Sequence, residues 1–129
     1  YLMGEAALVA ELDKVRPPYN ISALNAECAR FALAHAEEFA RQAQAIRAAR
    51  SVLITALQAL PGVKVWPSEG NMVLLRVPDA DKTFAGTKAA GVLIKNVSRM
   101  SPLLAQCLRL TVGTPEENAR MLAALSSAL

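Results

Sequence analysis

Apolar residues recur at steps of three and four positions through the first half of the chain. Over residues 4–15 this spacing predicts a short amphipathic helix. Pro17 and Pro18 end that helix, because proline lacks an amide donor and disfavours helical geometry in the residue before it. Across residues 21–60 an apolar stripe follows a period close to 3.6 residues, which predicts one very long helix or two helices joined near His35.

The second half of the chain consists of short β-branched and apolar runs bounded by glycine, proline and aspartate. We expect strands at 63–66, 72–77, 92–97 and 107–112, with a hairpin connection between the first two. One short helix is expected over 81–90, and a last helix begins at Pro115 behind a capping box formed by Thr114 and Glu117. This order predicts an α+β fold, in which helices pack on one face of a small mixed or antiparallel four-stranded sheet.

Length and composition exclude several classes of protein. The chain has 129 residues, of which 53% are hydrophobic and 19% charged, so we expect it to fold around one core. Its longest run without a charged residue, 51–63, is shorter than the roughly 20 residues that cross a bilayer. No basic leader precedes an apolar block, and because the sequence does not begin with Met we expect its first residue to be a cut end.

The cysteines, the histidine and the net charge exclude further classes of protein. Cys28 and Cys107 are too few for a disulfide framework, which is typical of a reducing cytoplasm, and the single His35 cannot supply a zinc site. The net charge of +3 favours an anionic partner. Nucleic acid fits that charge, and a small phosphorylated or carboxylated ligand fits it equally well. Only 5% of the residues are aromatic, and no Lys/Arg block runs along the chain.

Two basic residues interrupt the predicted strands. Strand alternation places Leu108 and Leu110 on one face of a strand and Arg109 on the other. The planar guanidinium of Arg109 suits a carboxylate or a phosphate, although a solvated charge on an open sheet face gives the same pattern. Lys95 interrupts its strand in the same way, and a lysine there is also typical of a strand edge protected against aggregation.

Three further polar residues lie where a ligand could be bound. Asn71 precedes a predicted strand, where it is either a ligand-facing amide or a turn residue. Tyr19 and Asn20 follow the double proline, whose rigidity suits binding residues and an ordinary helix cap alike. The chain contains no Gly-x-Ser-x-Gly motif and no phosphate-binding glycine-rich loop. We therefore expect no catalytic constellation within it.

Four segments of the sequence resemble a known family in both content and order. They are residues 12–22, which include Arg-Pro-Pro-Tyr-Asn, and residues 67–74, 91–97 and 107–118, the last of which begins Cys-Leu-Arg-Leu-Thr-Val-Gly. Together they are similar to the carboxy-terminal part of histidinol-phosphate aminotransferases, a family of fold-type I enzymes. The resemblance covers essentially the whole chain.

The resemblance implies a pyridoxal-phosphate enzyme of histidine biosynthesis, which is a cytoplasmic homodimer. Such an enzyme transfers an amino group between histidinol phosphate and 2-oxoglutarate. In this family the lysine that binds the cofactor lies in a large upstream domain. The resemblance therefore implies that 1–20 ends that domain and connects it, 21–60 is an interdomain helix, and 61–129 is a small substrate-recognition domain. The chain alone is expected to be inactive, with the large domain as its partner and no nucleic acid, membrane or metal involved.

The resemblance also assigns substrate-binding roles to single residues. Arg109 matches the arginine that binds the anionic end of the substrates. Lys95 occupies a position where many relatives have a second arginine, so it keeps the charge but lacks the planar fork. Tyr19 and Asn20 match a family loop near the cleft, and Asn71 lies in the matching segment 67–74; all three are expected to bind the substrate. Two alternatives remain open, another fold-type I aminotransferase or decarboxylase and a non-catalytic α+β binding or dimerisation module.

Overall fold

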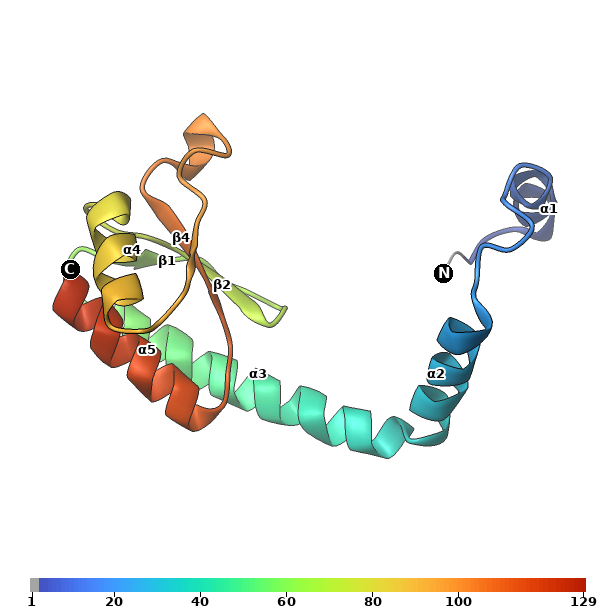
Figure 1. Cartoon of the computed structure of the whole chain (residues 1–129), viewed down its shortest axis with the longest axis horizontal. Helices are drawn as coiled ribbons and strands as arrows, with labels where there is room; N and C mark the ends of the chain where they lie inside the picture. Colours follow the sequence, from blue (N-terminus) through green and yellow to red (C-terminus); the bar gives the residue numbers. More distant parts are fainter. Residues whose placement is uncertain (1–2) are drawn as a thin grey trace. The chain divides into compact units, whose positions relative to one another are not determined.

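The computed structural model describes residues 3–129, which form two compact units (Figure 1). The first unit ends at Phe39 and contains helices α1 (Ala6–Asp13) and α2 (Ala23–Ala34). Ser22 caps α2, and its side chain accepts a hydrogen bond from the Asn25 amide at 3.1 Å. None of the described residues of this unit is buried.

The apolar stripe across residues 21–60 is carried by two helices that meet at His35. Helix α2 ends one residue before His35, and α3 (Ala36–Gln58) begins one residue after it. The His35 Nδ1 atom lies 2.8 Å from the Phe31 carbonyl oxygen, and the two rings stack with their centroids 4.0 Å apart. These contacts hold His35 in a non-helical conformation with φ −115°, which separates the helices.

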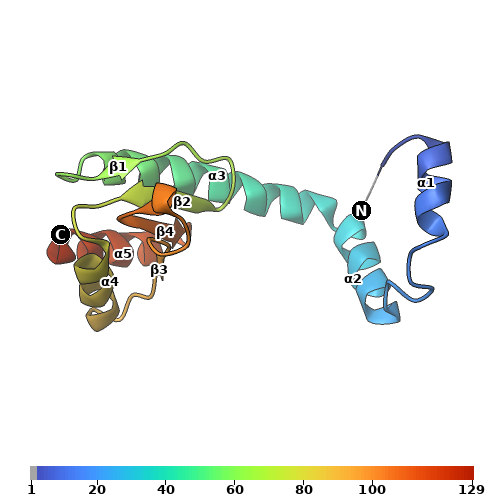
Figure 2. The ribbon, with the colours of Figure 1, turned by 90° about the horizontal axis from the view of Figure 1, so that it is seen from above.

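The second unit, Ala40–Leu129, is built around a four-stranded antiparallel sheet. Its strands are β1 (Lys64–Val65), β2 (Met72–Arg76), β3 (Lys95–Asn96) and β4 (Cys107–Thr111). Their spatial order is β1-β2-β4-β3, as Figure 2 shows, so β3 is an edge strand. The α+β fold and the hairpin between the first two strands are confirmed.

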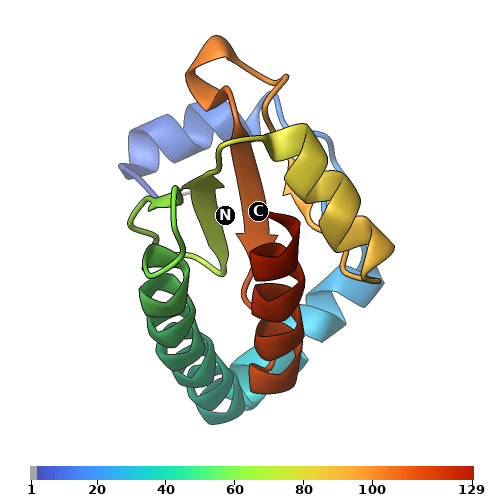
Figure 3. The same ribbon diagram turned by 90° about the vertical axis from the view of Figure 1, so that its left-hand side faces the viewer.

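Helices from three parts of the chain cover one face of this sheet. They are α3, α4 (Ala80–Ala89) and α5 (Pro115–Ala128), and α5 lies between the other two (Figure 3). Leu57 from α3 and Leu125 from α5 pack into one core with the strand residues. The buried strand side chains in that core are Val73 and Leu75 of β2 and Leu108 and Leu110 of β4. The opposite face of the sheet is left without a helix from this unit.

Two predicted strands are much shorter than expected. Strand β3 contains two residues where the sequence predicted 92–97, because the Val92 amide donates to the Thr87 carbonyl at 2.9 Å and Ile94 turns into the core. Strand β1 likewise contains two residues of the predicted 63–66. A 3₁₀ turn at Pro102–Leu104 precedes β4.

The helix boundaries follow local caps. Asp79 accepts a hydrogen bond from the Lys82 amide at 2.9 Å, so α4 begins one residue earlier than predicted. The predicted capping box at the start of α5 is confirmed: Thr114 and Glu117 each accept a hydrogen bond from the other's backbone amide. Within residues 3–129, no helix is long and apolar enough to cross a membrane.

Candidate functional site

The face of the sheet that carries no helix presents Arg109 at its centre. Arg109 lies on β4, directly opposite Leu74 of β2 on one side and Lys95 of β3 on the other. Side chains directly opposite each other on neighbouring strands have Cβ atoms about 4.5–5.5 Å apart. Arg109 and Lys95 are both exposed, whereas Leu108 and Leu110 are buried in the core. The exposure of Arg109 between buried Leu108 and Leu110 follows the predicted alternation, and the register of β3 against β4 brings the two basic residues together.

No acidic side chain neutralises this pair. Among the described residues 3–129, the side chains of Arg109 and Lys95 take part in no hydrogen bond and no ion pair. Like charges directly opposite each other on neighbouring strands are destabilising. An anion bound between them would remove that repulsion and would gain charge-assisted hydrogen bonds from the guanidinium fork. The pair is therefore suited to a phosphate or a carboxylate.

A third basic residue of the same face, Arg76, already has hydrogen-bond partners. Its Nε donates to the Ala105 carbonyl and its Nη2 donates to the Leu103 carbonyl, each at 3.0 Å. Its Cζ lies 5.3 Å from the ring centroid of Trp66, and Lys64 Nζ lies 5.2 Å from the same ring. Sequence reasoning missed this cluster, although Lys64 and Trp66 are two residues apart on a predicted strand and so share a face.

Asn71 lies in the bend that leads into β2, beside the end of β4. Its carbonyl oxygen accepts from the Val112 amide at 2.8 Å, so the backbone of the bend is joined to the sheet. The buried Arg50 of α3 donates to the neighbouring Gly70 carbonyl at 3.0 Å. Sequence reasoning missed Arg50, yet Leu53 and Leu57 follow it at i+3 and i+7, which places all three on the buried face of the helix.

Tyr19 and Asn20 belong to the first unit. The Asn20 side-chain oxygen accepts a hydrogen bond from Arg16 Nη1 at 3.1 Å, and the Tyr19 side chain is 93% exposed. Asn20 therefore stabilises the turn after the double proline. A substrate-binding role for these two residues stays a prediction.

The chain's own lysines do not fit covalent binding of a cofactor. A lysine that forms a Schiff base is commonly activated by burial in a desolvated pocket. All five lysines are exposed: Lys14, Lys64, Lys82, Lys88 and Lys95. Within the described part of the chain, no group of three or more His, Cys, Asp or Glu side chains is placed to hold a metal ion. What the Arg109 and Lys95 pair offers is positive charge and hydrogen-bond donors suited to an anion.

Known proteins resemble this chain over its full length. A histidinol-phosphate aminotransferase from Polaromonas naphthalenivorans is 65% identical over 129 residues, which are all of this chain and 35% of that enzyme. A crystal structure of an aminotransferase from Burkholderia pseudomallei, described as putative, has a TM-score of 0.82 at 28% identity, over 96% of this chain and 38% of that one. The histidinol-phosphate aminotransferase of Clostridium acetobutylicum shares the fold, with a TM-score of 0.83 at 18% identity over 94% of this chain and 37% of that one.

These likenesses confirm the family resemblance that the four segments carried. The chain spans about a third of the length of the relative it matches at 65% identity. The family model for aminotransferases of class I and II matches residues 1–125. Because this match spans nearly the whole chain, the chain belongs to the class I and II aminotransferase family.

Proposed function

We propose that this chain is the substrate-recognition part of a histidinol-phosphate aminotransferase. The observation that carries the proposal is the pair formed by Arg109 and Lys95, which lie opposite each other without an acidic partner among the described residues. Histidinol phosphate carries a phosphate and glutamate carries a side-chain carboxylate. One cationic site serves both substrates in turn.

The two basic residues contribute differently to this site. The Arg109 guanidinium donates two parallel hydrogen bonds to a phosphate or a carboxylate and so orients the bound substrate. Lys95 adds a compact positive charge whose direction is not fixed. Arg76 keeps its hydrogen bonds to backbone carbonyls and does not bind the substrate. Substrate-binding roles for Asn71, Tyr19 and Asn20 are part of the proposal too, and they rest on the family segments that these residues match.

The chemical step takes place outside this chain. We propose that a large domain of the same polypeptide, matching the rest of the relative's length, holds pyridoxal phosphate, which supplies the electron sink for transfer of the amino group. The helices within 21–60 then connect that domain to the small domain 61–129, and the enzyme is a homodimer. Cys28 and Cys107 are unpaired, which supports a reducing cytoplasmic setting.

A chimera tests the proposal. This chain replaces the matching 35% of the Polaromonas naphthalenivorans enzyme, and the purified chimera is assayed with histidinol phosphate and 2-oxoglutarate in the presence of pyridoxal phosphate. We expect transamination by the chimera and none by the chain alone under the same conditions. A chimera with Arg109→Ala is the matched control, and it should fold and bind cofactor but lose at least tenfold in kcat/KM.

Two outcomes would contradict the proposal. A folded, cofactor-loaded chimera without transaminase activity would favour the non-catalytic binding module. Turnover of a different phosphorylated amine or amino acid, with histidinol phosphate inert, would favour another fold-type I aminotransferase or decarboxylase.

A further inference from the structure

Strand β3 carries one half of the cationic pair on a very short element. It contains two residues at the edge of the sheet, and it pairs only with β4. Beyond the two residues, the Val97 amide donates to the Cys107 carbonyl at 3.1 Å. So short an edge strand gains little from ladder hydrogen bonds alone. Flanking contacts also hold Lys95 opposite Arg109: Ile94 and Val97 are buried, and Ser98 Oγ donates to the Cys107 carbonyl at 3.2 Å.

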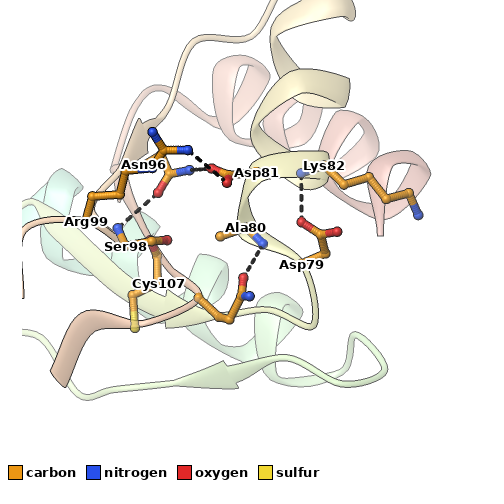
Figure 4. A network of polar contacts seen from close by, with 9 residues as sticks. Asp79, Ala80, Asp81, Lys82, Asn96, Ser98, Arg99 and Cys107 are labelled. Carbon is orange, nitrogen blue, oxygen red and sulfur yellow. Dashed lines mark hydrogen bonds and ion pairs between the residues drawn. The ribbon is translucent and has the colours of Figure 1, made fainter. Parts of the chain in front are cut away.

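A further contact with β3 comes from the first turn of α4. The Asp81 Oδ1 atom accepts a hydrogen bond from the Asn96 side-chain amide at 2.7 Å (Figure 4). Asn96 is the second residue of β3 and the direct neighbour of Lys95. The other Asn96 side-chain atom, Oδ1, accepts from the Ser98 amide at 3.0 Å. Both polar atoms of the Asn96 side chain are therefore engaged, one on the helix and one on the chain that leaves the strand.

The same turn of α4 is joined to the start of β4. The Ala80 amide donates to the side-chain oxygen of Gln106 at 2.7 Å, and the Gln106 carbonyl accepts from the Val77 amide at 3.0 Å. Gln106 has φ 60°, a left-handed conformation that costs a non-glycine residue free energy and persists where surrounding contacts hold it. Strand β4 begins at the next residue and carries Arg109 two positions later.

We infer that Asp81 is a positioning residue that keeps Lys95 opposite Arg109. It binds Asn96 from α4, and its neighbour in that helix, Ala80, donates to Gln106, the residue that precedes the strand of Arg109. The helix turn thus contacts β3 and the segment that leads into β4. That the pair binds a substrate anion rests on the proposed function, whereas the placement of β3 by Asp81 does not.

Three variants separate the positioning of β3 by Asp81 from the stability of α4 and from the negative charge of Asp81. Asp81→Ala removes the acceptor for Asn96. Asp81→Asn removes the charge and the ion pair with Arg99, which joins two exposed side chains at 3.3 Å, but keeps an oxygen that accepts from Asn96. Asp79→Ala removes the cap of the same helix and leaves the contact with β3 intact.

The first measurement is amide hydrogen exchange on the chain itself. In Asp81→Ala we expect the Val97 amide to exchange at least tenfold faster, while the Val112 amide, which joins β4 to the bend before β2, is unchanged. Asp81→Asn should restore slow exchange at Val97. Asp79→Ala should speed exchange in the first turn of α4 and leave Val97 as it is. Unchanged exchange at Val97 in Asp81→Ala, or equal acceleration there in Asp79→Ala, would overturn the inference.

The second measurement is steady-state kinetics of the same variants in the chimera. Loss of a negative charge near the site would by itself tighten binding of an anion, so a rise in KM cannot be a charge effect. We expect Asp81→Ala to raise KM for histidinol phosphate about three- to tenfold with kcat within twofold, and Asp81→Asn to stay at or below the unmodified KM. Asp79→Ala should leave both constants unchanged.

The outcomes distinguish failure of the positioning role from failure of the proposed function. A fall in KM for Asp81→Ala, or an equal rise in Asp79→Ala, overturns the positioning role. An inactive unmodified chimera contradicts the proposed function, and the exchange rates at Val97 then decide the inference by themselves.

Discussion

Arg50, Arg76 and Arg109 lie in the same unit, yet their guanidinium groups meet three different environments. Arg50 is 9% exposed and donates to the Gly70 carbonyl, so it fixes a backbone bend from within the core. Arg76 donates to two carbonyls and lies against the Trp66 ring. Arg109 lies opposite Lys95, and its guanidinium has no hydrogen bond or ion pair among residues 3–129. The unsatisfied donors of Arg109 distinguish it as the residue suited to an external anion.

The planar fork of Arg109 can be tested apart from its charge. Arg109→Lys in the chimera keeps the charge and removes the second parallel hydrogen bond. A hydrogen bond to a charged group contributes about 1.5–3 kcal/mol, so kcat/KM should fall on the order of tenfold or more. Lys95→Arg is the matched exchange and should be near neutral or slightly improve binding of histidinol phosphate. Full activity of Arg109→Lys would show that Arg109 is an ordinary surface charge and does not orient the substrate.

Strand alternation was enough to predict the exposure of Arg109, because the apolar residues on either side of it fix the face of the strand. The pairing with Lys95 could not be predicted in the same way, since register depends on contacts between distant segments. Arg50 could have been recognised as buried from Leu53 and Leu57, which follow it on the same helix face. Nothing in the local pattern links Asp81 to Asn96, which lie fifteen residues apart.

At the scale of single elements, features determined by neighbouring residues were predicted correctly, whereas features determined by tertiary contacts were not. The capping box that begins α5 was predictable because its two residues, Thr114 and Glu117, are three positions apart and act on the same turn. The length of β3 was not, because the Val92 amide bonds to α4 instead of continuing the ladder. The strand therefore begins three residues later than predicted, because Val92 is bonded to the preceding helix and Ile94 is buried in the core.

The first turn of α5 predicts a pH dependence of stability. Hydrogen bonds from the Glu116 backbone amide and the Thr114 side chain lower the pKa of the Glu116 carboxyl. A lowered pKa in the folded state stabilises the fold fully above the ordinary value for glutamate, about 4.3, and this contribution is lost as the pH falls through the lowered pKa. Glu116→Gln should therefore reduce the free energy of unfolding at neutral pH and have no effect at the acid end.

Urea unfolding of the chain from neutral pH down to about pH 3, with and without Glu116→Gln, measures this difference. The two curves of unfolding free energy against pH should converge on the acid side. A constant offset at every pH would show that the substitution acts through something other than the charge of Glu116.

At the scale of the whole molecule, the two units differ in what can stabilise them. The second unit buries a continuous core that joins the sheet to α3, α4 and α5. Helices α1 and α2 contain 8 and 12 residues, and neither has a buried side chain. Isolated helices shorter than about 12–15 residues are marginal in water, because helix nucleation is unfavourable and most helical stability in proteins comes from packing.

Hydrogen exchange should reveal this difference directly. In the chain alone, we expect amides of α1 and α2 to exchange close to the rates of an unstructured peptide, while amides of β2 and β4 exchange only through global unfolding. In the chimera, the remaining two thirds of the polypeptide would supply packing partners for the apolar side chains of these helices, including Leu8, Leu24 and Phe31, which are exposed here. Protection of α1 and α2 should then rise at least tenfold. Equal protection in the chain and in the chimera would show that these helices do not pack against a larger domain, and it would remove the structural reason for assigning them to the connection between domains.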